Sequence, residues 1–228
     1  MDTPSIALLK TLAKPPVVEP KDIEHAVKVA RVTGTQGIRN AALLYVLFGT
    51  GLTAGEIGRL TTHDYCDAKG VTRRKCIVRA EISYNGYERA LFWANTKLVT
   101  AVDAYLAWRV ENSVGLGTPG RYRDLDPHSP LFHNGRSGGG FSATKYIKDG
   151  VERESAMVLS ALFKQLLKQA GVEGSTLSGR RTLAVLLARQ GKDPALVREM
   201  LGLRNISQAR EMMRTDPVRM ADIVAKAF

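Results

Sequence analysis

Cysteine, long apolar runs and a recognisable leader are all scarce or missing in this 228-residue chain. The two cysteines, Cys66 and Cys76, lack metal-ligand spacing and are too few for a disulfide framework, which favours a reducing compartment. No apolar run approaches the ~18 residues that a membrane span needs. The start, M-D-T-P-S-I-A-L-L-K, lacks the basic leader and long apolar core of a secretory signal. We therefore expect a cytoplasmic, nucleoid-associated protein without a membrane partner, a metal or a cofactor.

Acidic residues are also few. The chain has 22 Asp and Glu against 33 Lys and Arg, a formal net charge of +11. Such an excess favours a polyanionic partner, because neutralising phosphates releases counterions. Apolar content of 44% and charged content of 24% are ordinary for a globular protein. Double-stranded DNA is the partner we expect, although charge alone also fits a merely basic soluble protein.

Periodicity and turn residues outline the secondary structure. Ser178 is the expected N-cap of a helix whose leucines share one face, and Glu56 is placed as a capping-box acid. Asp193-Pro194 predicts a helix start and Gly202 a helix end. Other expected helices span 21–32, 37–48, 97–110 and 154–170, expected strands span 76–78, 80–82 and 90–93 around a Tyr84-Asn85-Gly86 turn, and residues 112–140 are expected to form a flexible connection.

Two stretches resemble a known family. The run S-G-R-R-T-L-A-V-L-L-A-R-Q-G followed by L-G-L-R-N-I-S, together with T-G-L-T-A-G-E near residue 50, resembles the tyrosine recombinases, or phage integrases. The resemblance covers roughly residues 36–215. It implies an α+β catalytic-domain fold, mainly α with a small antiparallel β-sheet, preceded by an arm and short helix (1–35). Residues 216–228 would form a final helix, exchanged between protomers or packed on its own domain.

The family's catalytic residues are largely replaced at the matching positions. The family pattern His-x-x-Arg falls on Leu177 and Arg180, so only the arginine is kept. The second histidine position is Leu203, and the tyrosine nucleophile position is Met212. The first arginine, which clamps the phosphate, is replaced by Thr53, and the lysine general acid falls on Tyr84 or Asn85.

The loss of the nucleophile does not depend on a fine alignment. The last tyrosine is Tyr146 and the last histidine is His133, both far before Met212. A thioether has no proton to lose and no nucleophilic oxygen, so it cannot form the family's covalent intermediate with DNA. We therefore expect no recombinase activity and no catalytic residues.

The resemblance also implies which side chains would contact DNA. The first turns of the helix expected at 154–170 would lie in the major groove, and the hairpin would flank the backbone. For each side chain an ordinary solvent-exposed role is the alternative. The residues expected at the DNA are Arg180, Arg181, Ser175, Lys75, Arg89, Met157, Ser160, Ala161, Lys164 and Arg204.

Three functions stay open. The first is a non-catalytic DNA-binding regulator or accessory factor, acting in transcription or recombination, with a mobile element as one setting and homo-oligomers on DNA as one option. The second is an interaction module that modulates a partner recombinase. The third is an active enzyme with a non-homologous nucleophile, and its candidates are Ser175, Ser178, Ser207, Thr215 and Tyr146.

Overall fold

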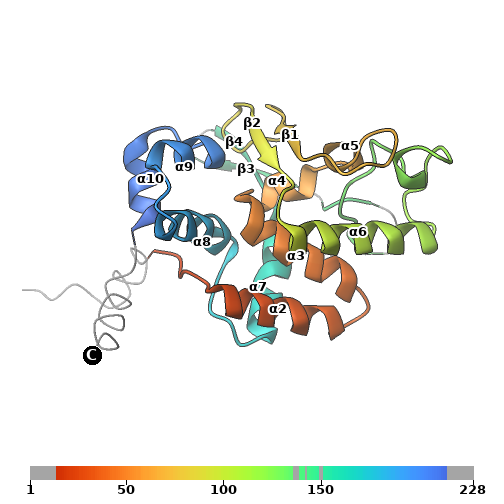
Figure 1. Cartoon of the computed structure of the whole chain (residues 1–228), viewed down its shortest axis with the longest axis horizontal. Helices are drawn as coiled ribbons and strands as arrows, with labels where there is room; N and C mark the ends of the chain where they lie inside the picture. Colours follow the sequence, from red (N-terminus) through yellow and green to blue (C-terminus); the bar gives the residue numbers. More distant parts are fainter. Residues whose placement is uncertain (1–13, 136–138, 142, 149–150, 215–228) are drawn as a thin grey trace, which may run out of the picture.

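The structure, a computed structural model, describes residues 14–135, 139–141, 143–148 and 151–214 (Figure 1). Helices dominate these residues, and the strands form two antiparallel hairpins, which confirms the expected fold class. The helices are α2 (Pro20–Val32), α3 (Gly37–Thr50), α4 (Ala54–Arg59), α5 (Thr62–Tyr65), α6 (Thr96–Glu111), α7 (Met157–Gln169), α8 (Thr176–Arg189), α9 (Pro194–Leu201) and α10 (Ile206–Met213), with a short 3-10 turn, η1 (Tyr122–Asp124). The strands are β1 (Lys75–Val78), β2 (Arg89–Phe92), β3 (Thr144–Lys148) and β4 (Val151–Ser155).

Helix α3 is the centre of the main core and contacts α2, α4, α6 and α8. Its leucines, Leu43, Leu44 and Leu47, are completely buried. At Gly179 of α8, an added Cβ would lie 2.5 Å from the Leu47 carbonyl oxygen. The glycine of S-G-R-R is therefore needed for α8 to approach α3 this closely.

The three last helices, α8, α9 and α10, form a second, smaller apolar cluster at one end of the molecule (Figure 1). The expected start and end of α9 are confirmed: the Asp193 side chain caps its first turn, and Gly202 follows in the left-handed conformation. The expected N-cap of α8 was wrong by one turn. Ser175 caps the helix, while Ser178 is the third helical residue, completes the capping box and is fully buried.

Only part of the predicted strand pattern is right. β1 and β2 pair antiparallel, with Lys75 opposite Phe92 and Val78 opposite Arg89. The strand expected at 80–82 is a turn instead. Its carbonyl groups do not join a ladder, because Arg59 donates hydrogen bonds to those of Glu81 and Ile82.

The helix expected from residue 154 begins only at Met157. The residues before it form β4, which pairs with β3 in a hairpin that the sequence did not predict. The local signal was misleading because E-S-A-M has no breaker, and strand pairing overrides a helix propensity of this strength.

The connection after α6 was expected to be flexible, yet Arg109 binds it to the core. Arg109 is 0% exposed and donates hydrogen bonds to the carbonyl oxygens of Val114 and Pro130 and to the Ser129 hydroxyl. Leu125, Leu131 and Phe132 of the same connection are buried. One buried cation therefore holds in place a stretch whose glycines and prolines had suggested a flexible connection.

The N-terminal segment contributes a helix to the core. Helix α2, in the segment expected to be an arm with a short helix, packs on α3 and α7. The helix expected at 216–228 lies outside the described residues. Among the described helices, none is long and apolar enough to cross a membrane.

Candidate nucleic-acid interface

Three positions that the resemblance assigns to catalysis meet at one cavity. Leu177, Arg180 and Met212 line a space of about 300 Å³ between α8, α10 and the segment before α2. Three of its seven lining side chains, Pro15, Leu177 and Met212, are apolar, and Leu177 is 60% exposed. The remaining lining residues are Lys14, Pro15, Arg181 and Glu211. Among the described residues, no histidine, tyrosine, serine or cysteine lines the cavity, so its wall offers no hydroxyl, thiol or imidazole group, and its carboxylate, Glu211, is paired with Lys14.

The segment before α2 forms one side of this cavity and is held by polar contacts. Arg181 donates a hydrogen bond to the Pro15 carbonyl oxygen at 2.7 Å, and the Val18 amide donates one to the Thr182 hydroxyl at 3.0 Å. Lys14 also forms an ion pair with Glu211 of α10. The sequence did not predict this role, because prolines indicate an extended backbone without indicating what it packs against.

Arg180, at a position that the resemblance assigns to an arginine, points into the protein. It is only 6% exposed and donates hydrogen bonds to the carbonyl oxygens of Leu201, at 2.7 Å, and Gly51, at 3.3 Å. Its guanidinium carbon lies 4.5 Å from the centroid of the Tyr84 ring. Burial lowers the pKa of Arg180, which stays a cation at any ordinary pH.

Tyr84 and Asn85, at the position of the family's lysine, close this region from the hairpin side. The Tyr84 hydroxyl and the Asn85 amide both donate hydrogen bonds to the Gly202 carbonyl oxygen, at 2.6 and 2.8 Å. These two contacts fasten the β1–β2 loop to the end of α9. The resemblance named the two positions, but nothing in the sequence indicated that they would cover Arg180.

Glu56 is completely buried and has no free acceptor left for a ligand. Its carboxylate accepts two hydrogen bonds from Arg89, at 2.7 and 2.8 Å, and one from each of the Thr53 and Tyr84 amides. Burial would raise the pKa of Glu56, but the Arg89 hydrogen bonds and charge outweigh it and hold the pKa below its usual value.

The remaining catalytic positions have ordinary structural roles. Thr53 is the N-cap of α4, where its hydroxyl accepts from the Glu56 amide and completes the expected capping box. Leu203 and Met212 pack against the small core cluster of α8, α9 and α10. Helix capping accounts for Thr53, and packing accounts for Leu203 and Met212, so none of the three needs a catalytic role.

The residues expected at DNA divide into a buried and an exposed group. Arg89, Arg180 and Arg181 are each less than 10% exposed and hydrogen-bonded to protein groups. Ser175 is half-buried as the N-cap of α8. The exposed residues are Lys75 on β1, Met157, Ala161 and Lys164 on one face of α7, with Ser160 half-buried beside them, and Arg204 after α9. Contact of any of them with DNA stays a prediction.

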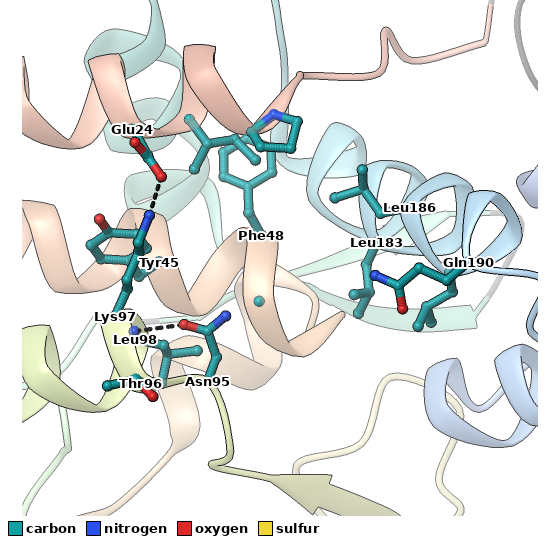
Figure 2. A pocket seen from close by; sticks show the side chains of 14 residues that line it. Glu24, Tyr45, Phe48, Asn95, Thr96, Lys97, Leu98, Leu183, Leu186 and Gln190 are labelled. Carbon is teal, nitrogen blue, oxygen red and sulfur yellow. Dashed lines mark hydrogen bonds and ion pairs between the residues drawn. The ribbon is translucent and has the colours of Figure 1, made fainter.

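A second concavity lies on the other side of α8, which the resemblance did not indicate. It has a volume of about 520 Å³ and separates the leucines of α8 from Phe48 of α3 and Leu98 of α6 (Figure 2). Lys97 and Glu24 form an ion pair on its rim. The leucines predicted to share one face of α8, Leu183, Leu186 and Leu187, line this groove and are half-buried. No group of three metal-ligating side chains occurs within the part of the chain described.

Comparison with solved structures gives the class of fold. The chain is similar to the XerA recombinase, with a TM-score of 0.65 and 19% identity over 95% of this chain and 67% of that one. It is also similar to the XerH site-specific recombinase bound to its palindromic difH substrate (TM-score 0.63, 17% identity, 94% and 53% of the two chains). A third similar structure is the Tn1549 transposon integrase with circular-intermediate DNA (TM-score 0.61, 16% identity, 93% and 66%).

These similarities show that the described chain has the fold of a tyrosine-recombinase catalytic domain. The chain spans between about half and two thirds of the length of those recombinases. Neither a protein-family model nor a curated protein sequence matches it.

Proposed function

We propose that this chain is a DNA-binding protein without recombinase activity, acting as a regulator or accessory factor in transcription or recombination. The observation that carries the proposal is the cavity at which Leu177, Arg180 and Met212 meet, because its wall holds no hydroxyl, thiol or imidazole group and its Lys14 and Glu211 are paired with each other. Phosphodiester cleavage by this fold needs a nucleophile held against the phosphate and a partner for its proton. The similar structures include recombinases in complex with DNA, which supports DNA as the partner of this chain.

The charge distribution supports binding as well. The whole chain carries a net charge of +11, and exposed cations lie on β1, α7 and the α9–α10 turn. Met157, Ala161 and Lys164 recur at helical spacing on the accessible face of α7. A helix face with one cation and small apolar groups suits phosphate contact and thymine methyls better than hydrogen-bonded reading of bases.

The first test is a binding titration with DNA from the protein's own genetic neighbourhood against random competitor, over a range of salt concentrations. We expect a preferred site that survives competitor, with a linear fall of log affinity against log salt. Absence of binding, or equal binding to all sequences, would overturn the specific-regulator proposal.

Loss of catalysis is tested separately with a nicked duplex that traps covalent protein–DNA adducts, resolved on a denaturing gel. The wild-type chain and Met212→Tyr are both expected to give no adduct, because Leu177 and Leu203 still replace the histidines. An adduct formed by the wild-type chain would contradict the proposal and favour a non-homologous nucleophile. Of the candidates for that role, Ser178 is buried, Ser207 is exposed, and Thr215 and the Tyr146 side chain lie outside the described residues.

One observation favours the second candidate function, modulation of a partner recombinase by protein contact. The groove beside α8 has a volume of about 520 Å³, and half-buried leucines line it (Figure 2). Leu186→Asp separates the two functions. If the groove holds a partner recombinase, this change weakens co-purification with that partner and leaves DNA affinity intact, whereas a DNA-only regulator is indifferent to it.

A further inference from the structure

Arg180 is a buried cation that donates no hydrogen bond to a carboxylate among the described residues. Among the described residues, the groups that accept its hydrogen bonds are the carbonyl oxygens of Gly51 and Leu201. Glu56 is occupied elsewhere, because both of its carboxylate oxygens accept from Arg89. A guanidinium has five N–H donors, and two carbonyl contacts leave some of them unused. Glu56 attracts Arg180 without contacting it and is hydrogen-bonded to Arg89, so two buried arginines share one carboxylate, and this position favours an anion as an additional partner.

The Tyr84 ring lies over that cation. Tyr84 is 45% exposed and Arg180 only 6%, with 4.5 Å between the guanidinium carbon and the ring centroid. The ring provides a weak, charge-neutral partner for a cation, as aromatic faces do. A phosphate would offer a full negative charge and paired oxygens in its place.

Tyr84 is held at its hydroxyl end by a hydrogen bond to α9 and at its backbone by the amide, which donates to Glu56 at 3.1 Å. Its hydroxyl and the Asn85 amide share one acceptor, the Gly202 carbonyl oxygen. Both donors belong to the loop between β1 and β2, and the next residue, Gly86, has nothing packed against its Cβ position. The Glu56–Arg89 pair beneath the loop stays intact when these two hydrogen bonds are lost, because it involves neither side chain.

We propose that Tyr84 is a removable cap over Arg180, and that a backbone phosphate of duplex DNA displaces it when the hairpin loop lifts. The inference rests on the proposed DNA-binding function for its ligand, although the cap itself can be observed without DNA. It makes Arg180 a phosphate contact of the bound state and explains how a 6%-exposed arginine can serve as one.

The test compares Tyr84→Ala with Tyr87→Ala, a matched control in the same loop whose ring is 74% exposed. Each variant is labelled, without DNA, with the arginine-selective dicarbonyl phenylglyoxal, and modification of Arg180 is measured by mass spectrometry. We expect little labelling in the wild type and Tyr87→Ala, strong labelling in Tyr84→Ala, and an intermediate extent in Tyr84→Phe, which keeps the ring and loses the hydroxyl contact. Equal labelling of Arg180 in all four proteins overturns the cap.

A second arm measures affinity for a duplex at several salt concentrations. Removing the cap is expected to raise affinity about tenfold with an unchanged log–log salt slope, because the same phosphate contact forms without the ring having to be displaced. The gain must disappear in Tyr84→Ala combined with Arg180→Gln. Persistence of the gain in the double variant, or its absence in Tyr84→Ala, overturns the proposal. If the wild type binds no DNA, the proposed function fails, while labelling still decides whether Tyr84 covers Arg180.

Discussion

Glu56 and Arg89 form a two-point ion pair inside the molecule, with Nη1–Oε1 and Nη2–Oε2 distances of 2.7 and 2.8 Å. It joins the first turn of α4 to β2 and supports the loop that carries Tyr84. An arginine fork and a carboxylate match in geometry, which makes such a pair strongly directional. The two sequence positions gave no sign of pairing, because 33 residues separate them.

Glu56→Gln is expected to destabilise the fold by about 3–5 kcal/mol, because it leaves the Arg89 cation buried without a counter-charge. Chemical denaturation at neutral pH measures this loss. Glu81→Gln is the control, because Glu81 pairs with Arg79 at the surface and its removal should change stability by about 1 kcal/mol or less. Equal losses for the two variants would contradict the interior role of the pair.

The pair also predicts how stability depends on acid. The pKa of Glu56 is lowered in the folded state, so its contribution is fully present above the unfolded pKa of about 4.3. That contribution is lost as the pH falls through the lower folded pKa. The free energy of unfolding, measured by chemical denaturation at several pH values from 7 down to 3, should therefore fall more steeply with decreasing pH for the wild type than for Glu56→Gln. An equal decrease in the two proteins would refute the assignment.

Thr53 offers a test of helix capping at a position that the resemblance assigns to an arginine. Its hydroxyl caps α4 by accepting from the Glu56 amide at 3.2 Å. Thr53→Ala should cost about 1 kcal/mol of stability, whereas Thr53→Ser keeps the cap and should cost only a few tenths. Thermal unfolding of the two variants separates them, and a serine variant as unstable as the alanine variant would show that the hydroxyl is not what matters.

Arg109 should control the order of the long connection after α6. Arg109→Met is expected to cost about 3 kcal/mol or more, since several buried carbonyl groups lose their donor at once. Hydrogen exchange across residues 114–133 should rise strongly while α2 and α3 change little. The exposed Arg121 gives the control, and a similar exchange pattern in Arg121→Met would argue against a specific role for Arg109.

The sequence predicted the helices better than the contacts among them. Helix α9 was predictable in full, because Asp193, Pro194 and Gly202 are local signals of its start and end. The β3–β4 hairpin was not, since strand pairing depends on partners that periodicity in one segment does not reveal. In the candidate site, the resemblance located Leu177, Arg180 and Met212, which do share a cavity. The cap by Tyr84 and the wall formed by Pro15 depend on tertiary packing alone.

Burial predicts which of the expected DNA contacts act directly. Lys164 on α7 and Arg204 after α9 are exposed, so Lys164→Ala and Arg204→Ala should each lower the magnitude of the salt slope by about one without changing stability. Arg89→Ala should instead destabilise the fold, because it leaves the buried Glu56 carboxylate unpaired. The measurement is a DNA titration at several salt concentrations beside a denaturation curve for each variant.

If Lys164→Ala and Arg204→Ala both bind DNA with the wild-type salt slope, the DNA lies on another face, and the exposed cations of β1 become the next to replace. If Arg89→Ala folds as stably as the wild type and loses affinity, the ion pair is dispensable and Arg89 itself reaches the phosphate.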